Sequence, residues 1–184
     1  MVETDLSSFS NEAYFPGPFV KRVIWYVVSL LIFRPAFPWP SKIKVLILRS
    51  FGAEVGTRVV IKPSLALKYP WFLSVGDNVW IGEQVWIDNL VKVTLGNNSC
   101  ISQGAMLLTG NHNYAKSTFD LMAKPIYVGN GVWLGAKSVV CPGVRCESHA
   151  VLTVGSVATS DLEPFSIYSG IPAIKTKNRE IFEG

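Results

Sequence analysis

The chain has 184 residues, a length that suits one domain and leaves no room for separate catalytic and binding domains. Because 49% of the residues are hydrophobic and only 16% are charged, the composition excludes a disordered chain. The mean hydropathy of +0.31 predicts apolar surface that is buried against a membrane or between subunits. The net charge of +4 is modest and no basic stripe alternates with aromatic residues, so we expect no nucleic acid as a partner.

The N-terminal third is apolar, but its longest apolar run is too short to cross a bilayer. That run, residues 23–33, falls well below the roughly 20 residues that a spanning helix needs. Glu3 and Asp5 stand where a secretory signal carries basic residues, so no such signal is expected. Cationic residues flank the run. We favour the interpretation that they are the solvated flanks of packed helices. The alternative is that residues 20–50 make a peripheral contact with an anionic membrane face. The cationic residues are Lys21, Arg22, Arg34, Lys42, Lys44 and Arg49.

The cysteine and histidine counts limit redox and metal chemistry. Cys100, Cys141 and Cys146 form no CxxC pair and are odd in number, so neither a disulfide framework nor a structural zinc site is expected. A catalytic zinc takes three protein ligands, often histidines, and the chain has only two histidines. We therefore expect no metal, no thiol nucleophile, and a location in the reducing cytoplasm.

A six-residue repeat dominates residues 55–160. An aliphatic residue followed by glycine recurs, as in Val75-Gly76 and Ile81-Gly82. Three such units carry the chain once around a triangle, so that the aliphatic residues stack inward and the glycines occupy tight corners. Helical periodicity is absent from this region, which excludes a helical repeat and a doubly wound sheet. The sequence predicts an all-β solenoid, a parallel β-helix.

The repeat spacing locates an insertion. Val55, Val75 and Leu95 follow one another at equal intervals, but the step from Leu95 to Val128 is longer by about 13 residues, an excess that a stacked repeat must extrude as a loop. The excess falls at about residues 109–125, a polar, proline-terminated stretch. Extruded loops of solenoids tend to carry function.

One of the two histidines lies in this loop. His112, in Gly110-Asn111-His112-Asn113, has the one side chain type that accepts protons near neutral pH, so it is a candidate general base. A loop histidine that only hydrogen-bonds the backbone is an equally good interpretation of the residue taken alone. The other histidine, His149, falls at the turn of a repeat unit, where we expect an exposed and inert side chain.

Asp88 and Asn89 break the repeat at the position where a small residue is expected. They precede His112 by just over one coil, so we expect them beneath it in the stack, where they would bind an acceptor hydroxyl together with Asn111. Ordinary turn chemistry is the alternative.

Three tryptophans, Trp80, Trp86 and Trp133, each end a six-residue unit. We expect them to stack on one flank of the solenoid as structural filler. Trp133 follows the loop by one unit and is the one with a candidate role at the site.

Several segments together resemble the hexapeptide-repeat acyltransferases, and within them most closely the colanic acid biosynthesis acetyltransferases. They are the repeats, the TGNH loop that ends in Lys-Pro-Ile, VGNGVWLGAKSVVCPGV, the closing GIPA, and the stretches at 33–56 and 85–96. The resemblance covers about residues 33–175. It implies a left-handed β-helix, a homotrimer with active sites between subunits, and acetyl-CoA as the acyl donor.

The resemblance also implies roles for individual residues. His112 would take the proton from a sugar hydroxyl as that oxygen attacks the thioester. The backbone N–H near Ala136 would stabilise the negative oxygen of the intermediate, and Trp133 would flank the site. Asp88 and Asn89 match family positions on the side of the active site where the acceptor sugar binds. Residues along the CoA arm are Gly155, Ser156, Thr159 and, toward the phosphates, Lys175.

We therefore expect an N-terminal, partly helical cap at 1–54, the β-helix at 55–174 and a tail at 175–184. The expected function is acetyl-CoA-dependent O-acetylation of a sugar in exopolysaccharide or surface polysaccharide synthesis. Two alternatives stay open at this point. One is acetylation of an antibiotic or another small alcohol or amine, and the other is a non-catalytic β-helix scaffold.

Overall fold

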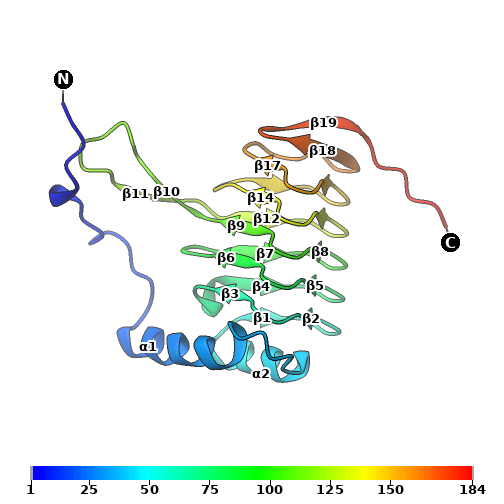
Figure 1. Ribbon diagram of the computed structural model, residues 1–184, viewed down its shortest axis with the longest axis horizontal. Helices are drawn as coiled ribbons and strands as arrows, with labels where there is room; N and C mark the ends of the chain where they lie inside the picture. The colour runs from blue at the N-terminus through cyan, green and yellow to red at the C-terminus, as the bar shows by residue number, and fades with distance from the viewer. Residues whose placement is uncertain (1, 184) are drawn as a thin grey trace.

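The computed structural model describes residues 2–183 and forms a triangular column of stacked β-coils (Figure 1). Each coil contributes one short strand to each of three parallel sheets, so the expected parallel β-helix is confirmed. Sheet A contains β1 (Glu54–Val55), β4 (Leu73–Val75), β7 (Val93–Leu95), β12 (Ile126–Val128) and β15 (Arg145–Cys146). Sheet B contains β2 (Val60–Ile61), β5 (Trp80–Ile81), β8 (Cys100–Ile101), β13 (Trp133–Leu134), β16 (Val151–Leu152), β18 (Ser166–Gly170) and β19 (Ala173–Asn178). Sheet C contains β3 (Ala66–Leu67), β6 (Trp86–Asp88), β9 (Met106–Leu108), β14 (Val139–Val140) and β17 (Val157–Ala158).

The core is the column of inward-pointing residues that the repeat predicts. In sheet B, for example, Ile61, Ile81, Ile101, Leu134 and Leu152 lie in register, and all are buried. Burial of a side chain of this size stabilises a fold by about 1.5–3 kcal/mol, and each coil adds three of them. Because each coil covers only its neighbours, stability accumulates along the column.

The corner between sheets C and A differs from the other two. In the two lower coils the chain goes from the inward residue of sheet C to that of sheet A between Leu67 and Val75 and between Ile87 and Leu95. Each of these steps is two residues longer than the corresponding step from Val140 to Cys146 in an upper coil. In the first coil the additional length forms the short helix η3 (Pro70–Phe72). After Leu108 the same corner opens into the inserted loop, which returns to the stack at Ile126. The loop contains an antiparallel hairpin of β10 (Gly110–His112) and β11 (Leu121–Ala123).

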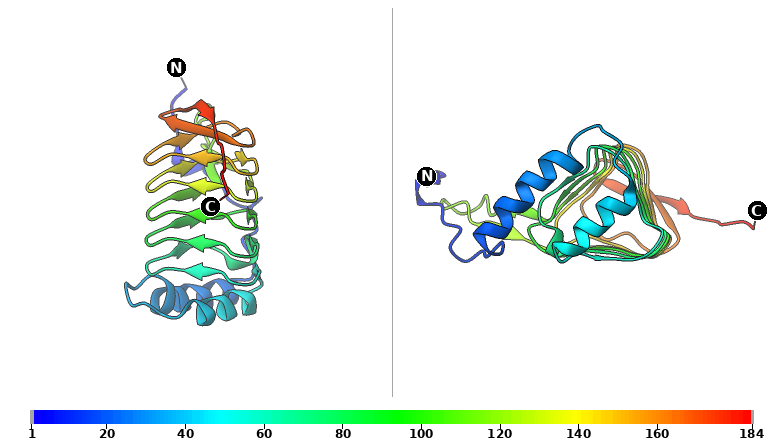
Figure 2. Two further views of the ribbon diagram at one scale, coloured as in Figure 1. Left: turned by 90° about the vertical axis from the view of Figure 1, so that its right-hand side faces the viewer. Right: turned by 90° about the horizontal axis from the view of Figure 1, so that it is seen from below.

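The N-terminal part closes the lower end of the column. Helix α1 (Phe19–Val28), the wider helical turn η2 (Ser29–Phe33) and α2 (Ser41–Ser50) lie across the first coil (Figure 2). Trp25, Phe33 and Leu48 are buried against the coil residues. Within residues 2–183 no helix combines the length and the apolar character that crossing a bilayer requires.

Two of the cationic residues that flank the apolar N-terminal run, Lys44 and Arg49, form hydrogen bonds between the cap and the first coil. Lys44 is fully buried, and its Nζ donates to the carbonyl oxygens of Ile61 (3.2 Å) and Lys62 (3.0 Å); burial lowers the pKa of this amine. Arg49 donates to the carbonyl oxygen of Val55 from Nε at 3.0 Å. These cations satisfy carbonyl groups that have no strand below them.

At the upper end the chain reverses, and β19 pairs antiparallel with β18. Strand β19 runs through the boundary that we expected between residues 174 and 175, so the irregular tail begins only after Asn178. The two ends of the chain leave the column on opposite sides (Figure 2).

The expectation that three tryptophans stack on one flank is wrong. Trp80 and Trp133 point outward from sheet B with Cys100 between them, whereas Trp86 points outward from sheet C. Six residues move the chain by one side of the triangle, so equal positions in successive units fall on different faces. Only residues a full coil apart share a face.

Candidate active site

The inserted loop is anchored to the coil beneath it at its first residues. Thr109 is fully buried, and its hydroxyl donates to the Asp88 carbonyl and accepts from the Leu90 N–H, both at 2.8 Å. Gly110 follows, and a Cβ there would lie 2.7 Å from Cδ1 of Leu90. These contacts fix the start of β10, and with it the position of His112 two residues later, against the corner that contains Asp88.

His112 is held by one residue in two ways. Its Nδ1 lies 2.9 Å from the carbonyl oxygen of Phe119, and its ring stacks on the Phe119 ring with centroids 4.4 Å apart. A carbonyl oxygen only accepts hydrogen bonds, so Nδ1 carries the proton and Nε2 keeps a free lone pair. The half-buried imidazole is therefore fixed in the tautomer that acts as a base through Nε2.

The segment before α1, residues 2–18, runs along the column from the cap to the loop, and we call it the N-terminal strap (Figure 1). It contains the single turn η1 (Leu6–Ser8). The Asp5 N–H donates to the Ser117 carbonyl at 2.8 Å, and the Tyr14 hydroxyl donates to the Leu90 carbonyl at 2.7 Å. Phe9 packs its ring on His112 with centroids 5.7 Å apart.

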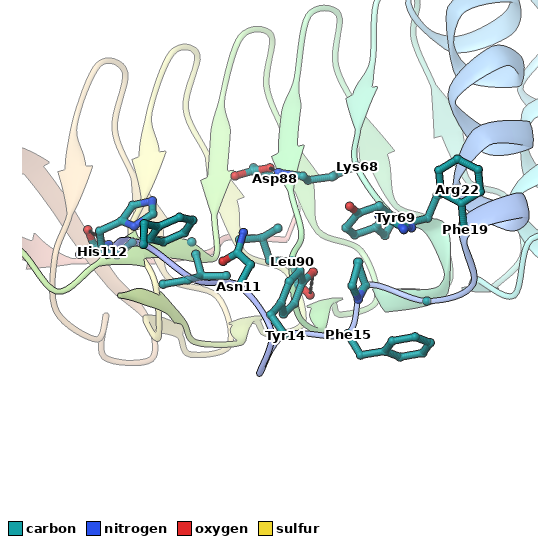
Figure 3. A pocket seen from close by; sticks show the side chains of 16 residues that line it. Asn11, Tyr14, Phe15, Phe19, Arg22, Lys68, Tyr69, Asp88, Leu90 and His112 are labelled. Carbon is teal, nitrogen blue, oxygen red and sulfur yellow. Dashed lines mark hydrogen bonds and ion pairs between the residues drawn. The ribbon is translucent and has the colours of Figure 1, made fainter. Parts of the chain in front are cut away.

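The strap, the loop and the long corner enclose an open cavity of about 840 Å³. Figure 3 shows His112 at one end and Arg22 and Phe19 of α1 at the other. Between them, Lys68 and Asp88 form an ion pair, with Nζ 3.1 Å from Oδ1. Charged and hydroxyl groups beside aromatic rings are a lining that suits a saccharide. We call this the His112 cavity.

Tyr14 is a polar group of this cavity that sequence reasoning missed. Burial raises the pKa of its hydroxyl, and Tyr69 and Asp88 raise it further. The phenol therefore stays protonated and keeps its hydrogen bond to Leu90 at neutral pH. Nothing in the polar composition of residues 2–18 indicated that they pack on the loop, because the contact depends on two segments about 100 residues apart.

The structure places Asp88 and Asn111 in the wall of the His112 cavity, but not Asn89. Asn111 is exposed, and its Oδ1 accepts from the His112 N–H at 2.8 Å. Asn89 is fully buried: its Oδ1 accepts from the Tyr69 N–H at 3.0 Å, and its Nδ2 donates to the Tyr69 carbonyl at 2.6 Å. The amide of Asn89 therefore joins two coils, which corrects the expectation that it binds an acceptor.

The residues expected on the donor side, and Trp133, which was expected to flank the site on the substrate side, lie on other parts of the column than His112. Ala136 and Gly155 occupy the corner between sheets B and C, whereas the loop of His112 leaves between sheets C and A. Trp133 is 48% exposed on sheet B, with its Nε1 donating to the Ser102 hydroxyl at 2.9 Å. One chain therefore does not bring these residues to His112.

The remaining three expected donor-side residues differ in accessibility. Ser156 is buried, and its hydroxyl is hydrogen-bonded to Thr153 (2.9 Å) and to the Gly170 N–H (3.0 Å). Thr159 is exposed. Lys175 is also exposed, and its Nζ lies 2.7 Å from Oε2 of Glu163. The buried hydroxyl of Ser156 therefore has a structural role. Of the expected donor-side residues, Gly155, Thr159 and Lys175 are exposed and remain accessible to a ligand.

Other candidate chemistry is limited by burial. Burial raises the pKa of the Cys100 and Cys141 thiols, and burial with nearby Asp161 and Glu147 raises that of Cys146 to about 12. These thiols are therefore protonated at neutral pH and weak nucleophiles. His149 is half-buried and stacks on Phe165 with centroids 4.6 Å apart, so it is less exposed than expected. Across residues 2–183, no three His, Cys, Asp or Glu side chains are grouped so as to hold a metal.

Comparison with known proteins places this geometry in a family. No protein-family model matches the chain. The chain is 34% identical over 180 residues to WcaF of Escherichia coli (strain K12), named as a colanic acid biosynthesis acetyltransferase, covering 95% of this chain and 97% of that protein. It is 27% identical over 143 residues to the galactoside O-acetyltransferase of the same organism, covering 76% and 70% of the two chains.

Solved structures share the fold. The hexapeptide-repeat acetyltransferase VCA0836 of Vibrio cholerae superposes with a TM-score of 0.79 at 20% identity, over 88% of this chain and 92% of that one. A galactoside acetyltransferase in complex with coenzyme A superposes with a TM-score of 0.77 at 22% identity, over 88% and 82%. The fold is thus the left-handed β-helix of these enzymes. The chain belongs to the hexapeptide-repeat acetyltransferases, in the family of the colanic acid biosynthesis acetyltransferases.

Proposed function

We propose that this acetyltransferase transfers the acetyl group of acetyl-CoA to a hydroxyl group of a sugar during the synthesis of a surface polysaccharide. The observation that carries the proposal is the fixed tautomer of His112, which presents a basic Nε2 at a cavity with a polar and aromatic lining. The names of WcaF and of galactoside O-acetyltransferase support a saccharide as the acceptor. The galactoside acetyltransferase in complex with coenzyme A supports acetyl-CoA as the donor.

The reaction balances without an acyl-enzyme. Nε2 of His112 takes the proton of the sugar hydroxyl while its oxygen attacks the thioester carbonyl, so a C–O bond forms and the carbonyl oxygen becomes negative. The intermediate then expels the CoA sulfur, and the imidazolium returns the proton to that thiolate. The carbonyl of Phe119 accepts from Nδ1–H throughout and stabilises the charged imidazolium.

The negative oxygen needs a hydrogen-bond donor, and we assign this role to the N–H of Ala136. In residues 2–183 this N–H has no acceptor, although the Ala136 carbonyl accepts from Gly155 at 2.9 Å. Removal of one such donor typically costs 100-fold to 1000-fold in kcat in other enzymes.

A homotrimer would bring Ala136 of one subunit to His112 of the next. Two faces of the column support this assembly, because their outward positions are apolar. Those positions are Val60, Trp80, Cys100, Trp133, Val151 and Ile167 in sheet B, and Ala66, Trp86, Met106, Val139 and Val157 in sheet C. Sheet A instead carries Glu54, Ser74, Thr94, Tyr127 and Arg145. Burial of two apolar faces around a threefold axis would also account for the high mean hydropathy.

We place the enzyme in the cytoplasm, with the cap resting on the inner face of the membrane. The outer side of α1 and η2 supports this contact, because apolar side chains there are 42–70% exposed. They are Phe19, Val20, Val23, Ile24, Tyr26, Val27, Leu30 and Leu31. An apolar helix face beside cationic residues is typical of a peripheral contact.

The test is CoA release from acetyl-CoA with a panel of sugars, comparing wild type with His112→Ala and, as a control, Tyr114→Ala. Tyr114 lies on the same loop and is 82% exposed. We expect wild type and Tyr114→Ala to turn over and His112→Ala to lose about 100-fold or more. Equal activity of His112→Ala and wild type would overturn the mechanism. Turnover with chloramphenicol or amines but no sugar would overturn the acceptor class.

A further inference from the structure

A second cavity of about 420 Å³ opens beside the His112 cavity, between α1, η2 and the first coil; we call it the α1 groove. The two cavities meet at four shared residues. These residues are Phe19, Arg22, Lys68 and Tyr69. A ligand bound in the α1 groove can therefore extend past Arg22 toward His112 (Figure 3).

Polar groups in this groove lack partners. Ser29 is 3% exposed, yet its hydroxyl has no hydrogen bond to any residue from 2 to 183, and the same holds for the buried Nε of Arg22. Neither Arg22 nor Arg34 forms an ion pair within that range. Buried polar atoms normally have partners, so the unsatisfied Ser29 hydroxyl and Arg22 Nε, together with the lack of an ion pair in that range at either guanidinium group, indicate a site for an anion. Guanidinium groups match the oxygens of a phosphate.

The rest of the groove is apolar. Its wall is formed by Val23, Trp25, Tyr26 and Leu67. Val23 and Tyr26 also belong to the exposed apolar side of α1, being 45% and 57% exposed. The groove therefore continues onto the surface that we assign to the membrane contact.

We infer that the α1 groove holds the phosphate and the first part of the lipid chain of a lipid-linked saccharide. Arg22 and Arg34 bind the phosphate, the lipid chain follows Val23 and Tyr26 toward the bilayer, and the sugar extends into the His112 cavity. This inference rests on the proposed function and adds to it the carrier on which the acceptor sugar arrives. Charge complementarity and the continuity of the two cavities support this occupant.

A binding measurement tests the groove without catalysis. Isothermal titration calorimetry would compare farnesyl diphosphate, below its micelle concentration, with inorganic diphosphate and with farnesol. We expect farnesyl diphosphate to bind at least about tenfold more tightly than either part, because the groove has both an anionic and an apolar subsite. Arg34→Gln should weaken that binding about tenfold or more, whereas Arg58→Gln, in the first coil and outside the groove, should not. Equal binding by wild type and Arg34→Gln would overturn the inference.

A kinetic measurement tests the path to His112. One sugar would be offered free, as its nucleoside diphosphate derivative and as its farnesyl diphosphate derivative. We expect the farnesyl derivative to have the highest kcat/KM, at least about tenfold above the free sugar, and Arg34→Gln to reduce that ratio. A higher kcat/KM for the nucleoside derivative, or equal values for free and farnesylated sugar, would overturn the lipid carrier and leave the proposed function standing. Binding of farnesyl diphosphate without acetylation of any sugar would overturn the proposed function while supporting the groove.

Discussion

The imidazole of His112 receives its hydrogen bond and its stacking partner from the same residue, Phe119. The carbonyl oxygen of Phe119 lies 2.9 Å from Nδ1, and the two rings are within 8° of parallel. The carbonyl determines that Nδ1 carries the proton, and the stacked phenyl ring fixes the orientation of the imidazole plane and therefore the direction of the Nε2 lone pair. Since the carbonyl belongs to the backbone, a substitution of Phe119 removes only the second of these contacts.

Phe119→Ala should therefore lower kcat by a modest amount. We expect a loss of about 3-fold to 30-fold with little change in the KM for acetyl-CoA, because the base keeps its tautomer but loses its fixed orientation. Phe119→Leu should recover part of the loss. A loss as large as that of His112→Ala, or none, would contradict the positioning role.

Asn89→Ala should act on stability. The buried amide of Asn89 bonds both backbone groups of Tyr69, so its removal leaves them unpaired and should cost about 1–3 kcal/mol in the free energy of unfolding. Urea denaturation measures this loss. Asn11→Ala, at an exposed position in the wall of the His112 cavity, is the matched control and should change the acceptor KM rather than stability. A raised acceptor KM with unchanged stability for Asn89→Ala would restore its role as an acceptor ligand.

Cys146 should make stability fall with pH in the alkaline range. Its pKa is raised from the ordinary value of 9.0 to about 12 in the folded chain. Below pH 9 the thiol is protonated in both states, whereas between pH 9 and 12 the unfolded chain loses a proton that the folded chain keeps. Stability therefore declines in this window, with a slope approaching about 1.4 kcal/mol per pH unit.

The measurement is the free energy of unfolding at pH 8 and pH 10 for wild type and Cys146→Val. Valine occupies the same inward column at Val55, Val75 and Val128, so the variant should keep the packing. We expect a smaller decline with pH in the variant, and the contributions of Tyr14 and the other thiols cancel in the comparison. The same decline in both proteins would show that Cys146 does not hold its proton as argued.

The trimer predicts complementation between two inactive variants. His112→Ala lacks the base, and Ala136→Phe blocks the proposed donor-side N–H, so each should be inactive alone. If each site takes His112 from one subunit and Ala136 from its neighbour, random mixing leaves about a quarter of the sites intact. Co-refolding the two and measuring CoA release should recover about a quarter of wild-type activity, and the particle mass should be about three times 20.3 kDa. No recovery from a particle of that mass would place both residues in one subunit.

Much of the fold was predictable because a six-residue repeat is a local pattern with one geometric solution. The spacing of Val55, Val75 and Leu95 predicted the coils, and the longer step to Val128 predicted an extruded loop. The family resemblance singled out His112, since the residue alone left a structural role equally open. The position of Asp88 under the loop followed from counting residues per coil.

Other features depend on which side of the triangle a residue faces or on contacts between distant segments. Trp86 and Trp133 have the same place in the repeat but lie on different sheets, and Asn89 and Asp88 are neighbours of which only Asp88 lines the cavity. The repeat identifies which positions point inward, but not which outward residues meet another segment.

The sequence by itself determined the coiled architecture, the place of the loop and the identity of the candidate base. Only the tertiary structure decided how that base is held and what surrounds it. Phe9 reaches His112 because the strap folds back along the coils between the cap and the loop, and Arg22 joins two cavities because α1 crosses the end of the first coil. Such contacts join segments far apart in the chain, and their free energy depends on surfaces that exist only after the coils have stacked.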